Sequence, residues 1–163
     1  MTVPAPSVLA ALESAGLSYR VIEHTAPVRS LAEAAAARGV EVVDVVKTLV
    51  VRRGEDDYLF VLVPGGRSIS WPKLRALLAV SRMSMPPADE AFAATGFERG
   101  TITPLGSSRA WPVVADVVLA SRGEVTLGSG AHEVAIAVDA TAFLEAVGAT
   151  IADVTEPDQA QIP

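Results

Sequence analysis

The sequence predicts a mixed α/β domain in which hairpins build much of the β-sheet. Two kinds of pattern support this class: apolar residues at helical spacing behind capping residues, and β-branched runs separated by turn formers. The order in which these helices and strands follow one another is typical of mixed α/β proteins. A length of 163 residues suits one core, so we expect residues 1–163 to form a single domain.

The first part of the chain predicts a helix, a strand and a second helix. Residues 7–15 carry apolar residues at helical spacing after a serine that can cap, and a glycine follows. Residues 17–24 alternate well enough to form a strand. Ser30 and Glu33 then make a capping-box pattern for a helix that ends at Gly39.

The middle of the chain predicts a hairpin followed by two helices. Residues 45–52 and 58–64 are β-branched or aromatic runs, and the segment "RGEDD" between them contains turn formers. Ser70, followed by a proline in the first turn, favours a helix over 72–80. Residues 86–96 repeat this pattern, with prolines first, acidic residues in the first turn and a glycine at the end.

The next part predicts a loop and two strands. Residues 97–112 contain two glycines and two prolines, which favours a loop with strand-like pieces. Residues 113–120 and 133–138 favour strands. The segment 123–132 between these strands carries enough glycine for tight turns.

The end of the chain predicts one more helix and a loose tail. Asp139 stands where a helix cap belongs, before a helical pattern over 140–149. The polar residues 154–163 are expected to fray.

Composition excludes several classes of chemistry. The chain has no cysteine and two histidines, so it has no thiol nucleophile, no thiolate zinc site and no histidine-rich metal cluster. We therefore expect neither a metal nor another cofactor. The net charge of −6 argues against a broad cationic face for nucleic acid. With neither a basic signal segment nor a long apolar stretch, the chain is expected to be a cytoplasmic protein without a membrane partner.

The stretch "VVKTLVV", residues 45–51, sets Lys47 among apolar neighbours. A strand that is apolar on both faces is covered on both sides, so the ammonium is at least partly desolvated and needs a partner. Such a lysine can act as a tuned base or bind an anion. Alternatively, it reaches the edge of the sheet, or it protects an edge strand from aggregation.

Two glycine-containing loops are candidate ligand-binding segments. In "GTITPLG", residues 100–106, glycine allows close backbone approach and Pro104 fixes the turn. Consecutive N–H groups of such a loop can hold an oxyanion or phosphate, although most Gly/Pro loops are only turns. Thr101 and Thr103 could orient water or be ordinary strand residues. A second loop, which lacks the lysine of a P-loop, could line a ligand or be a plain hairpin turn; it contains Gly128, Ser129 and Gly130.

Both histidines are candidates for the site. His24 lies at a strand-to-loop junction, where it is either a general base, since histidine titrates near neutrality, or a structural hydrogen-bonding residue. His132 follows the glycine turn and reaches a pocket only if that turn folds inward. Asp139 is better explained as a helix cap than as a catalytic carboxylate.

These segments, in this order, resemble the YbaK/ProX-type aminoacyl-tRNA deacylases, which include the editing domain of bacterial prolyl-tRNA synthetase. The resemblance starts near "HTAPVRSLAEAAAARGV", continues through "VVKTLVV", "YLFVLVPGGRSISWPKLRAL" and "ATGFERGTITPLG", and ends at "GSGAHEVAIAVDATAFLEAVGATIADV". The most specific elements are Lys47 in its strand and the Gly-x-x-x-Pro pattern from Gly100 to Pro104.

The resemblance implies a mixed, barrel-like β-sheet surrounded by α-helices, and hydrolysis of the ester that joins a wrongly attached amino acid to tRNA. It implies that Lys47 lines the active-site pocket opposite the Gly-x-x-x-Pro loop, so the expected catalytic residues are Lys47, Gly100, Thr101 and Pro104. The expected substrate-binding residues are His24, Thr103, Gly128, Ser129, Gly130 and His132. A positioned water and loop N–H groups supply this chemistry without a protein nucleophile.

The expected partner is the acceptor end of tRNA, where few phosphates must be neutralised despite the acidic balance of the chain. A local basic patch could come from the residues around the predicted hairpin: Arg52, Arg53, Arg67, Lys73 and Arg75. Prolyl-tRNA synthetase or an elongation factor is a further candidate partner that would present the tRNA.

The sequence therefore predicts a free-standing trans-editing hydrolase that acts on Cys-tRNA(Pro) or Ala-tRNA(Pro). One alternative is a non-catalytic module that binds an aminoacyl-adenosine or a synthetase. Another is a serine hydrolase that pairs His132 with Ser107, Ser108 or Ser129, but no sequence context builds the strained turn of such a nucleophile.

Overall fold

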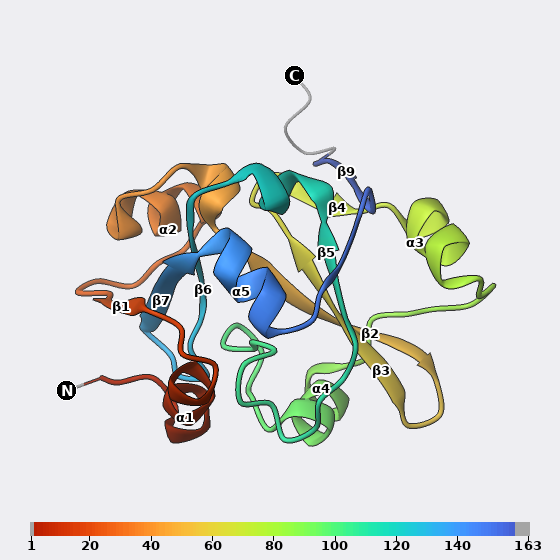
Figure 1. Cartoon of the computed structure of the whole chain (residues 1–163), viewed down its shortest axis with the longest axis horizontal. Helices are drawn as coiled ribbons and strands as arrows, with labels where there is room; N and C mark the ends of the chain where they lie inside the picture. The colour runs from red at the N-terminus through yellow and green to blue at the C-terminus, as the bar shows by residue number, and fades with distance from the viewer. Residues whose placement is uncertain (1, 159–163) are drawn as a thin grey trace.

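The computed structural model describes residues 2–158, and the mixed α/β class is confirmed (Figure 1). Within this range the α-helices are α1 (Pro6–Ser14), α2 (Leu31–Arg38), α3 (Trp71–Leu78), α4 (Ala88–Thr95) and α5 (Ala140–Ala146). Two short 3₁₀ helices are η1 (Val42–Asp44) and η2 (Val117–Ser121). The strands are β1 (Tyr19–Glu23), β2 (Lys47–Gly54), β3 (Asp57–Val63), β4 (Arg67–Ile69), β5 (Val113–Asp116), β6 (Glu124–Gly128), β7 (Val134–Asp139), β8 (Thr150–Ala152) and β9 (Thr155–Pro157).

The strands form three sheets, with the orders β1-β7-β6, β2-β3-β5-β8 and β4-β9. The predicted hairpin is present: β2 and β3 pair antiparallel, with Lys47 opposite Val63. In contrast, β5 pairs in parallel with both β3 and β8. The sheets of residues 2–158 do not close into one barrel, so the barrel-like sheet implied by the resemblance is here an arrangement of separate sheets.

The main core lies between the two larger sheets. Buried residues of α1, α4 and α5 join those of β2, β3, β5, β6 and β7 in one cluster, whose large buried members include Leu12, Phe60 and Phe143. Figure 1 shows α5 near the centre, between the β1-β7-β6 sheet and β5. A second cluster covers the other face of the β2–β3 hairpin and includes Val51 and Leu74. β3 is therefore buried on both faces, which fixes the hairpin in place.

Local capping explains where several helices begin. The hydroxyl of Ser30 accepts a hydrogen bond from the backbone of Glu33, as the capping-box pattern predicts. The carboxylate of Asp139 accepts from the backbone of Ala142, so its predicted role as a cap is confirmed. Ser70 occupies the cap position of α3, but its side chain makes no capping hydrogen bond, so that part of the prediction is wrong.

Three expectations near the end of the chain are wrong. The segment 123–132 contains a strand, β6, because its residues pair with both β7 and the backbone of Val46. The strand expected over 113–120 ends at Asp116, whose carboxylate accepts from the backbone of Val118 and starts η2 instead. The tail expected to fray contains β9, which pairs with β4; residues 159–163 of that tail lie outside the described range.

β2 leaves part of its backbone unpaired at one edge. At its start, the N–H of Val46 donates to a carbonyl of β6, and at its end Arg52 exchanges two backbone hydrogen bonds with Ser84. Because backbone groups alternate in direction along a strand, the N–H and C=O groups of Thr48 and Val50 point toward this same edge. A cavity opens in the gap between the two contacts.

Candidate functional site

The larger cavity opens on the free edge of β2 and has a volume of ≈ 570 Å³. One wall is β2 with the two residues before it. The start of α4 and the segment before it form an apolar wall, and the loop after α4 and the end of β6 complete the lining. The lining residues are Arg38, Val45, Val46, Lys47, Thr48, Leu49, Val50, Met85, Pro86, Pro87, Ala88, Ala91, Arg99, Gly100, Ile102 and Gly128.

A second cavity of ≈ 470 Å³ adjoins the first. The two cavities share Arg38, Gly100 and Gly128 in their linings. The lining of the second cavity includes the polar side chains of His24, His132 and Glu133. One extended ligand can therefore occupy both.

Lys47 lies at the start of β2, partly buried, and lines the larger cavity. Its ammonium donates a hydrogen bond of 2.7 Å to the backbone carbonyl of Arg67. Among residues 2–158 it has no carboxylate within ion-pair distance. The desolvated lysine expected from the sequence thus has a neutral partner, and its charge stays available to a ligand.

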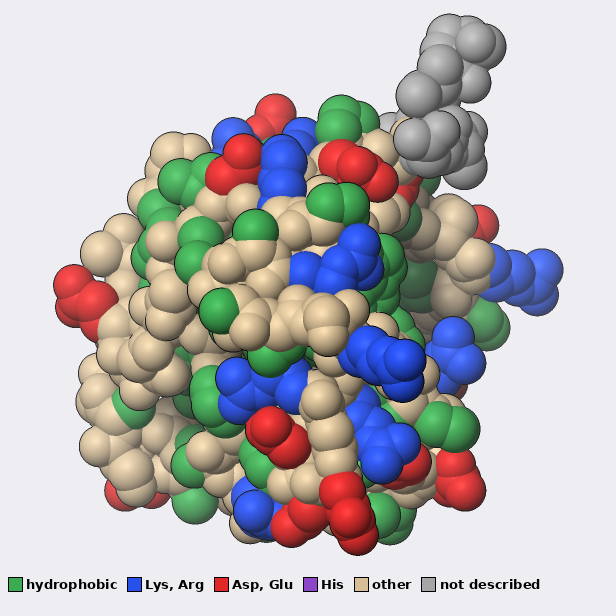
Figure 2. All heavy atoms as spheres, turned by 90° about the vertical axis from the view of Figure 1, so that its right-hand side faces the viewer, with side chains coloured by type: hydrophobic (Ala, Val, Ile, Leu, Met, Phe, Trp, Pro, Cys, Tyr) green, Lys and Arg blue, Asp and Glu red, His purple; other side chains and the backbone are tan. Residues whose placement is uncertain are grey.

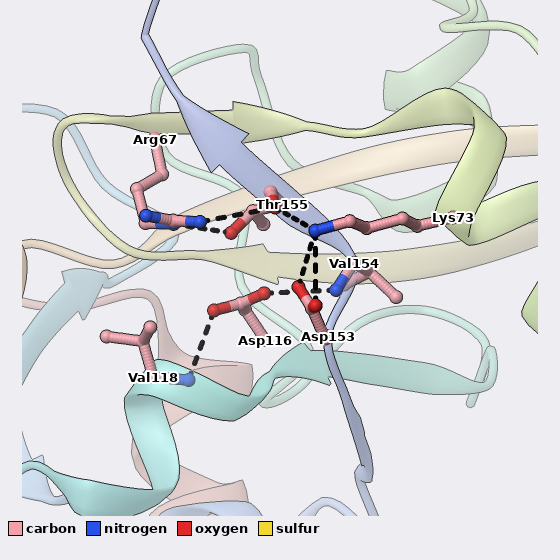
Figure 3. A network of polar contacts seen from close by, with 7 residues as sticks. All are labelled: Arg67, Lys73, Asp116, Val118, Asp153, Val154 and Thr155. Carbon is pink, nitrogen blue, oxygen red and sulfur yellow. Dashed lines mark hydrogen bonds and ion pairs between the residues drawn. The ribbon is translucent and has the colours of Figure 1, made fainter.

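A polar network fixes the strand to which Lys47 is bonded (Figure 3). The guanidinium of Arg67 donates to the hydroxyl and carbonyl of Thr155, at 2.7 and 3.2 Å, and so joins β4 to β9. The fully buried carboxylate of Asp116 accepts from the backbone N–H groups of Val118 and Val154 and holds the connection before β9. The carbonyl that receives the Lys47 ammonium is therefore held by several contacts.

The Gly-x-x-x-Pro loop contributes its backbone to the cavity and keeps its threonines inside the protein. Gly100 adopts a positive φ of 89° and lines both cavities. Thr101 and Thr103 are buried, and neither they nor Pro104 line a cavity. The Thr101 hydroxyl donates to the Glu98 carbonyl at 2.7 Å, and the Thr103 hydroxyl accepts from the backbone of Leu105. Their predicted contacts with water or substrate have no geometric support here.

The glycine turn after β6 packs directly against this loop. The N–H of Gly130 donates to the Thr101 carbonyl at 2.9 Å, and a Cβ at Gly128 would lie 2.8 Å from the Ile102 carbonyl. Only glycine allows this approach, so the two glycine loops of the sequence form one wall. Ser129 is fully buried and donates to the carbonyl of Val134 at 2.7 Å, which gives it a structural role.

His24 and Arg38 form a pair at the boundary of the two cavities. The Arg38 Nε donates to the His24 Nε2 at 3.3 Å, and one Nη donates to the Thr126 hydroxyl at 3.0 Å. Burial, and then the guanidinium, lower the pKa of His24 below its usual value, while Glu133 acts in the opposite direction. A neutral His24 that accepts from Arg38 is consistent with this shift.

His132 lies on the outer side of the second cavity and is exposed. Its Nε2 is 2.9 Å from a carboxylate oxygen of Glu98. Within the described residues no serine hydroxyl contacts it, and Ser107 and Ser108 donate to backbone carbonyls instead. The geometry gives no support to a serine hydrolase.

A family profile identifies the protein family to which the chain belongs. The profile of the aminoacyl-tRNA editing domain matches residues 25–146, which is well over half of the chain. The chain belongs to the aminoacyl-tRNA editing domain family. The match includes Lys47, the Gly-x-x-x-Pro loop and the glycine turn after β6, and it confirms the family predicted from those motifs.

Curated relatives of this editing domain are proline–tRNA ligases. The ligase of Thermosipho melanesiensis is 36% identical over 97 residues, which is 60% of this chain and 17% of the ligase. That of Trichlorobacter lovleyi is 30% identical over 106 residues, covering 65% and 18% of the two chains. The chain thus spans less than a fifth of the length of these ligases.

A solved structure of similar size is also related to this editing domain. It is described as a candidate trans-editing enzyme for prolyl tRNA synthetase and is 30% identical. The two superpose with a TM-score of 0.84, and the match covers 94% of this chain and 99% of the other.

Several lining residues of the editing domain were not expected from the sequence. Thr48 lines the larger cavity, and its buried hydroxyl has no hydrogen-bond partner among residues 2–158. Arg38 and Arg99 add positive charge to the lining, and the segment from Met85 to Ala88 adds an apolar wall. Neighbouring lysine, proline and glycine residues carry sequence signals, whereas a hydroxyl without a partner can be found only once the fold is known.

The surface of the editing domain shows a limited basic area. Lys and Arg side chains gather across the centre of one face, with Asp and Glu among and below them (Figure 2). Of the five residues expected to form a patch, three make ion pairs within 4.0 Å: Arg52 with Glu90, Arg53 with Asp57 and Lys73 with Asp153. Their charge is therefore partly neutralised.

No helix in the part of the chain that the structure describes is long and apolar enough to span a membrane.

Proposed function

We propose that this editing domain hydrolyses the ester bond of a mischarged aminoacyl-tRNA, with Cys-tRNA(Pro) or Ala-tRNA(Pro) as its substrate. The observation that carries the proposal is the partly buried Lys47 ammonium, free of any carboxylate among residues 2–158, in the same cavity lining as Gly100. The proline–tRNA ligases among its relatives support tRNA-Pro as the tRNA. The likeness to a solved structure described as a candidate trans-editing enzyme supports action in trans.

The reaction needs a water molecule and a site for negative charge. Water adds to the ester carbonyl and gives up a proton, the tetrahedral oxyanion collapses, and the bond to the ribose oxygen breaks as that oxygen takes up the proton. The N–H groups of Gly100 and Ile102 donate to no protein acceptor among the described residues, and both residues line the cavity. They are the candidate oxyanion donors, while Lys47 stabilises the developing charge or holds a nearby phosphate.

The apolar wall gives the amino-acid side chain a place to lie. Met85, Pro87 and Ala91 are presented by α4 and the segment before it. A cavity of ≈ 570 Å³ exceeds what a small side chain fills, so part of the terminal nucleoside shares it. One methylene changes specificity by only about 1–3 kcal/mol, so selection between cysteine and alanine depends on small differences in this wall.

Recognition of the tRNA is confined to its acceptor end in this proposal. A net charge of −6 and the internal ion pairs of the basic residues leave few cations for a long phosphate backbone. Prolyl-tRNA synthetase is then a suitable partner to present the tRNA, because the domain itself needs to hold only the 3′ end.

The test is deacylation of tRNA-Pro charged with proline, alanine, cysteine or serine by the wild type and by Lys47→Ala. We expect hydrolysis of one mischarged species, and a fall of about 10²–10³-fold in its rate with the variant. Lys73→Ala is the matched control, because Lys73 is exposed, pairs with Asp153 and lies outside both cavities. Equal activity of Lys47→Ala and the wild type would refute the role of the lysine.

The alternative is a module that binds an aminoacyl-adenosine without hydrolysing it. The same cavity would serve, with Lys47 contributing affinity in place of rate. Binding of a non-hydrolysable aminoacyl-adenosine analogue by a folded protein that turns over none of the charged tRNAs would favour this alternative.

A further inference from the structure

Arg38 is placed where the two cavities meet. It ends α2, is partly buried and contributes to both linings, together with Gly100 and Gly128. A cation in the last turn of a helix is favoured by the helix dipole. That effect explains a basic residue at this position of α2, but not a partly buried arginine that lines two cavities.

The protein leaves part of this guanidinium without a partner. Arginine has five N–H donors. Nε donates to His24, and Nη1 donates to the Thr126 hydroxyl, both of them uncharged partners. Nη2 meets no acceptor among residues 2–158, and no carboxylate of this range lies within ion-pair distance of Arg38. A partly desolvated cation without a counter-ion is costly unless a ligand supplies an anion.

The surroundings favour an anion over a neutral ligand. His24 orients the guanidinium by accepting from its Nε, and Thr126 holds one of its amino groups. The other ionisable side chains lining the second cavity are Glu133, which is exposed, and His132, whose ring contacts Glu98. The two N–H groups of Nη2 and the second N–H of Nη1 remain as charged donors for phosphate oxygens.

We propose that the second cavity binds the 5′-phosphate of the terminal nucleotide and that Arg38 is its anchor. This inference rests on the proposed function, which places the aminoacyl ester in the larger cavity beside Lys47 and Gly100. Because the two cavities share Arg38, Gly100 and Gly128, one aminoacyl-nucleotide reaches from the ester site to the phosphate site. Arg38 thereby sets the position of the ester and is a positioning residue.

The experiment uses two ligands that differ only in the phosphate. They are the 3′-amide analogue of alanyl-adenosine, which cannot be hydrolysed, and the same compound with a 5′-phosphate. Calorimetric titration should show that the wild type binds the phosphorylated compound about 10- to 100-fold more tightly. Arg38→Gln should lose this preference and bind both compounds with equal affinity. A circular dichroism spectrum like that of the wild type would show that the variant is folded.

Two variants provide matched controls. Arg99 lines only the larger cavity, so Arg99→Gln should keep the preference for the phosphate. Arg38→Lys should keep part of it, because a point charge replaces the guanidinium. Inorganic phosphate should compete only weakly with the phosphorylated compound at the same concentration, since it lacks the nucleoside.

Each other outcome overturns the inference. A wild type that shows no preference for the phosphate or binds neither compound, an Arg38→Gln protein that retains the preference, or inorganic phosphate that binds as tightly as the nucleotide would each do so. Hydrolysis of charged tRNA is measured separately. If charged tRNA is hydrolysed but the preference for the phosphorylated compound does not depend on Arg38, only this inference is refuted. If the preference depends on Arg38 but no charged tRNA is hydrolysed, only the deacylase proposal is refuted.

Discussion

The β4–β9 side of the fold and the cavity side treat their polar groups in opposite ways. Around β4 and β9, the buried Asp116 uses both carboxylate oxygens, and Arg67 and Lys73 are bonded to neighbouring groups (Figure 3). Around the cavity, the Thr48 hydroxyl has no partner and the Arg38 guanidinium has no counter-ion in the described range. Buried polar groups are normally satisfied, so the exceptions mark where a ligand belongs.

Lys47 lies between these two regions and contacts both of them. Its ammonium is bonded to the carbonyl of Arg67 on the satisfied side, and its side chain lines the cavity on the other. The β4–β9 network thus provides rigidity, while the cavity lining provides unpaired polar groups for a ligand. Replacing residues on each side should therefore change different properties, stability in one case and ligand-dependent activity in the other.

The largest effect on stability is expected from Asp116→Asn. The amide can accept only one of the two backbone hydrogen bonds and sets its NH₂ group against the other N–H, so we expect a loss of about 1.5–3 kcal/mol. Chemical denaturation measures this loss. Asp153→Asn is the control, because its ion pair with Lys73 is exposed and is worth roughly 0–1 kcal/mol. Equal losses in the two variants would show that the network is not a special source of stability.

A somewhat smaller effect is expected from Gly128→Ala, at the boundary of the two regions. The added Cβ would lie 2.8 Å from a backbone oxygen of the Gly-x-x-x-Pro loop, and such overpacking costs about 1–3 kcal/mol. The loop must shift, so deacylation should fall along with the melting temperature. Gly123→Ala is the control, since its Cβ meets nothing within 4 Å. Full activity of Gly128→Ala would mean that the contact between the glycine loops does not position the site.

Thr48→Val separates a satisfied from an unsatisfied hydroxyl. The substitution removes a buried hydroxyl that has no partner, so stability should stay unchanged or rise by up to about 1 kcal/mol. Hydrolysis should nevertheless fall, because a ligand loses a polar contact. In the matched variant Thr103→Val, a hydroxyl that accepts from Leu105 is lost, so stability should fall by about 1 kcal/mol. A destabilised Thr48→Val would mean that its hydroxyl is satisfied in solution.

Local signals in the sequence account for the elements that were predicted correctly. The cap at Ser30, the cap at Asp139 and the two runs of the β2–β3 hairpin each act within a few residues of the chain. The missed elements depend on distant partners. β6 is flanked by glycines and pairs with β7 and Val46, while β4 and β9 have three residues each and form only against one another.

The residues of the site also fall into two groups: those with a local signal in the sequence, and those whose role depends on distant partners. Lys47 stands out because an ammonium in an apolar strand is unusual. Gly100 stands out because glycine allows close backbone approach and the following proline fixes the turn. Arg38 gives no such signal, since an arginine near the end of an alanine-rich helix is ordinary. Its role becomes visible only in the fold, where its guanidinium at the end of α2 contacts Thr126 of β6. Thr101 shows the reverse case: it lies in the correct motif, but its hydroxyl is used inside the protein.

The smallest effect is expected from the pH dependence of stability at His24. Burial and then Arg38 lower the pKa of His24 in the folded protein below its ordinary value of 6.5. The unfolded chain therefore binds more protons, and this residue should lower stability as the pH falls from 6.5 to the folded pKa. This fall in stability should be smaller in His24→Gln and unchanged in His132→Gln. Denaturation at several pH values measures it. Identical pH profiles for wild type and His24→Gln would show that burial and the Arg38–His24 contact do not hold the imidazole neutral at the cavity.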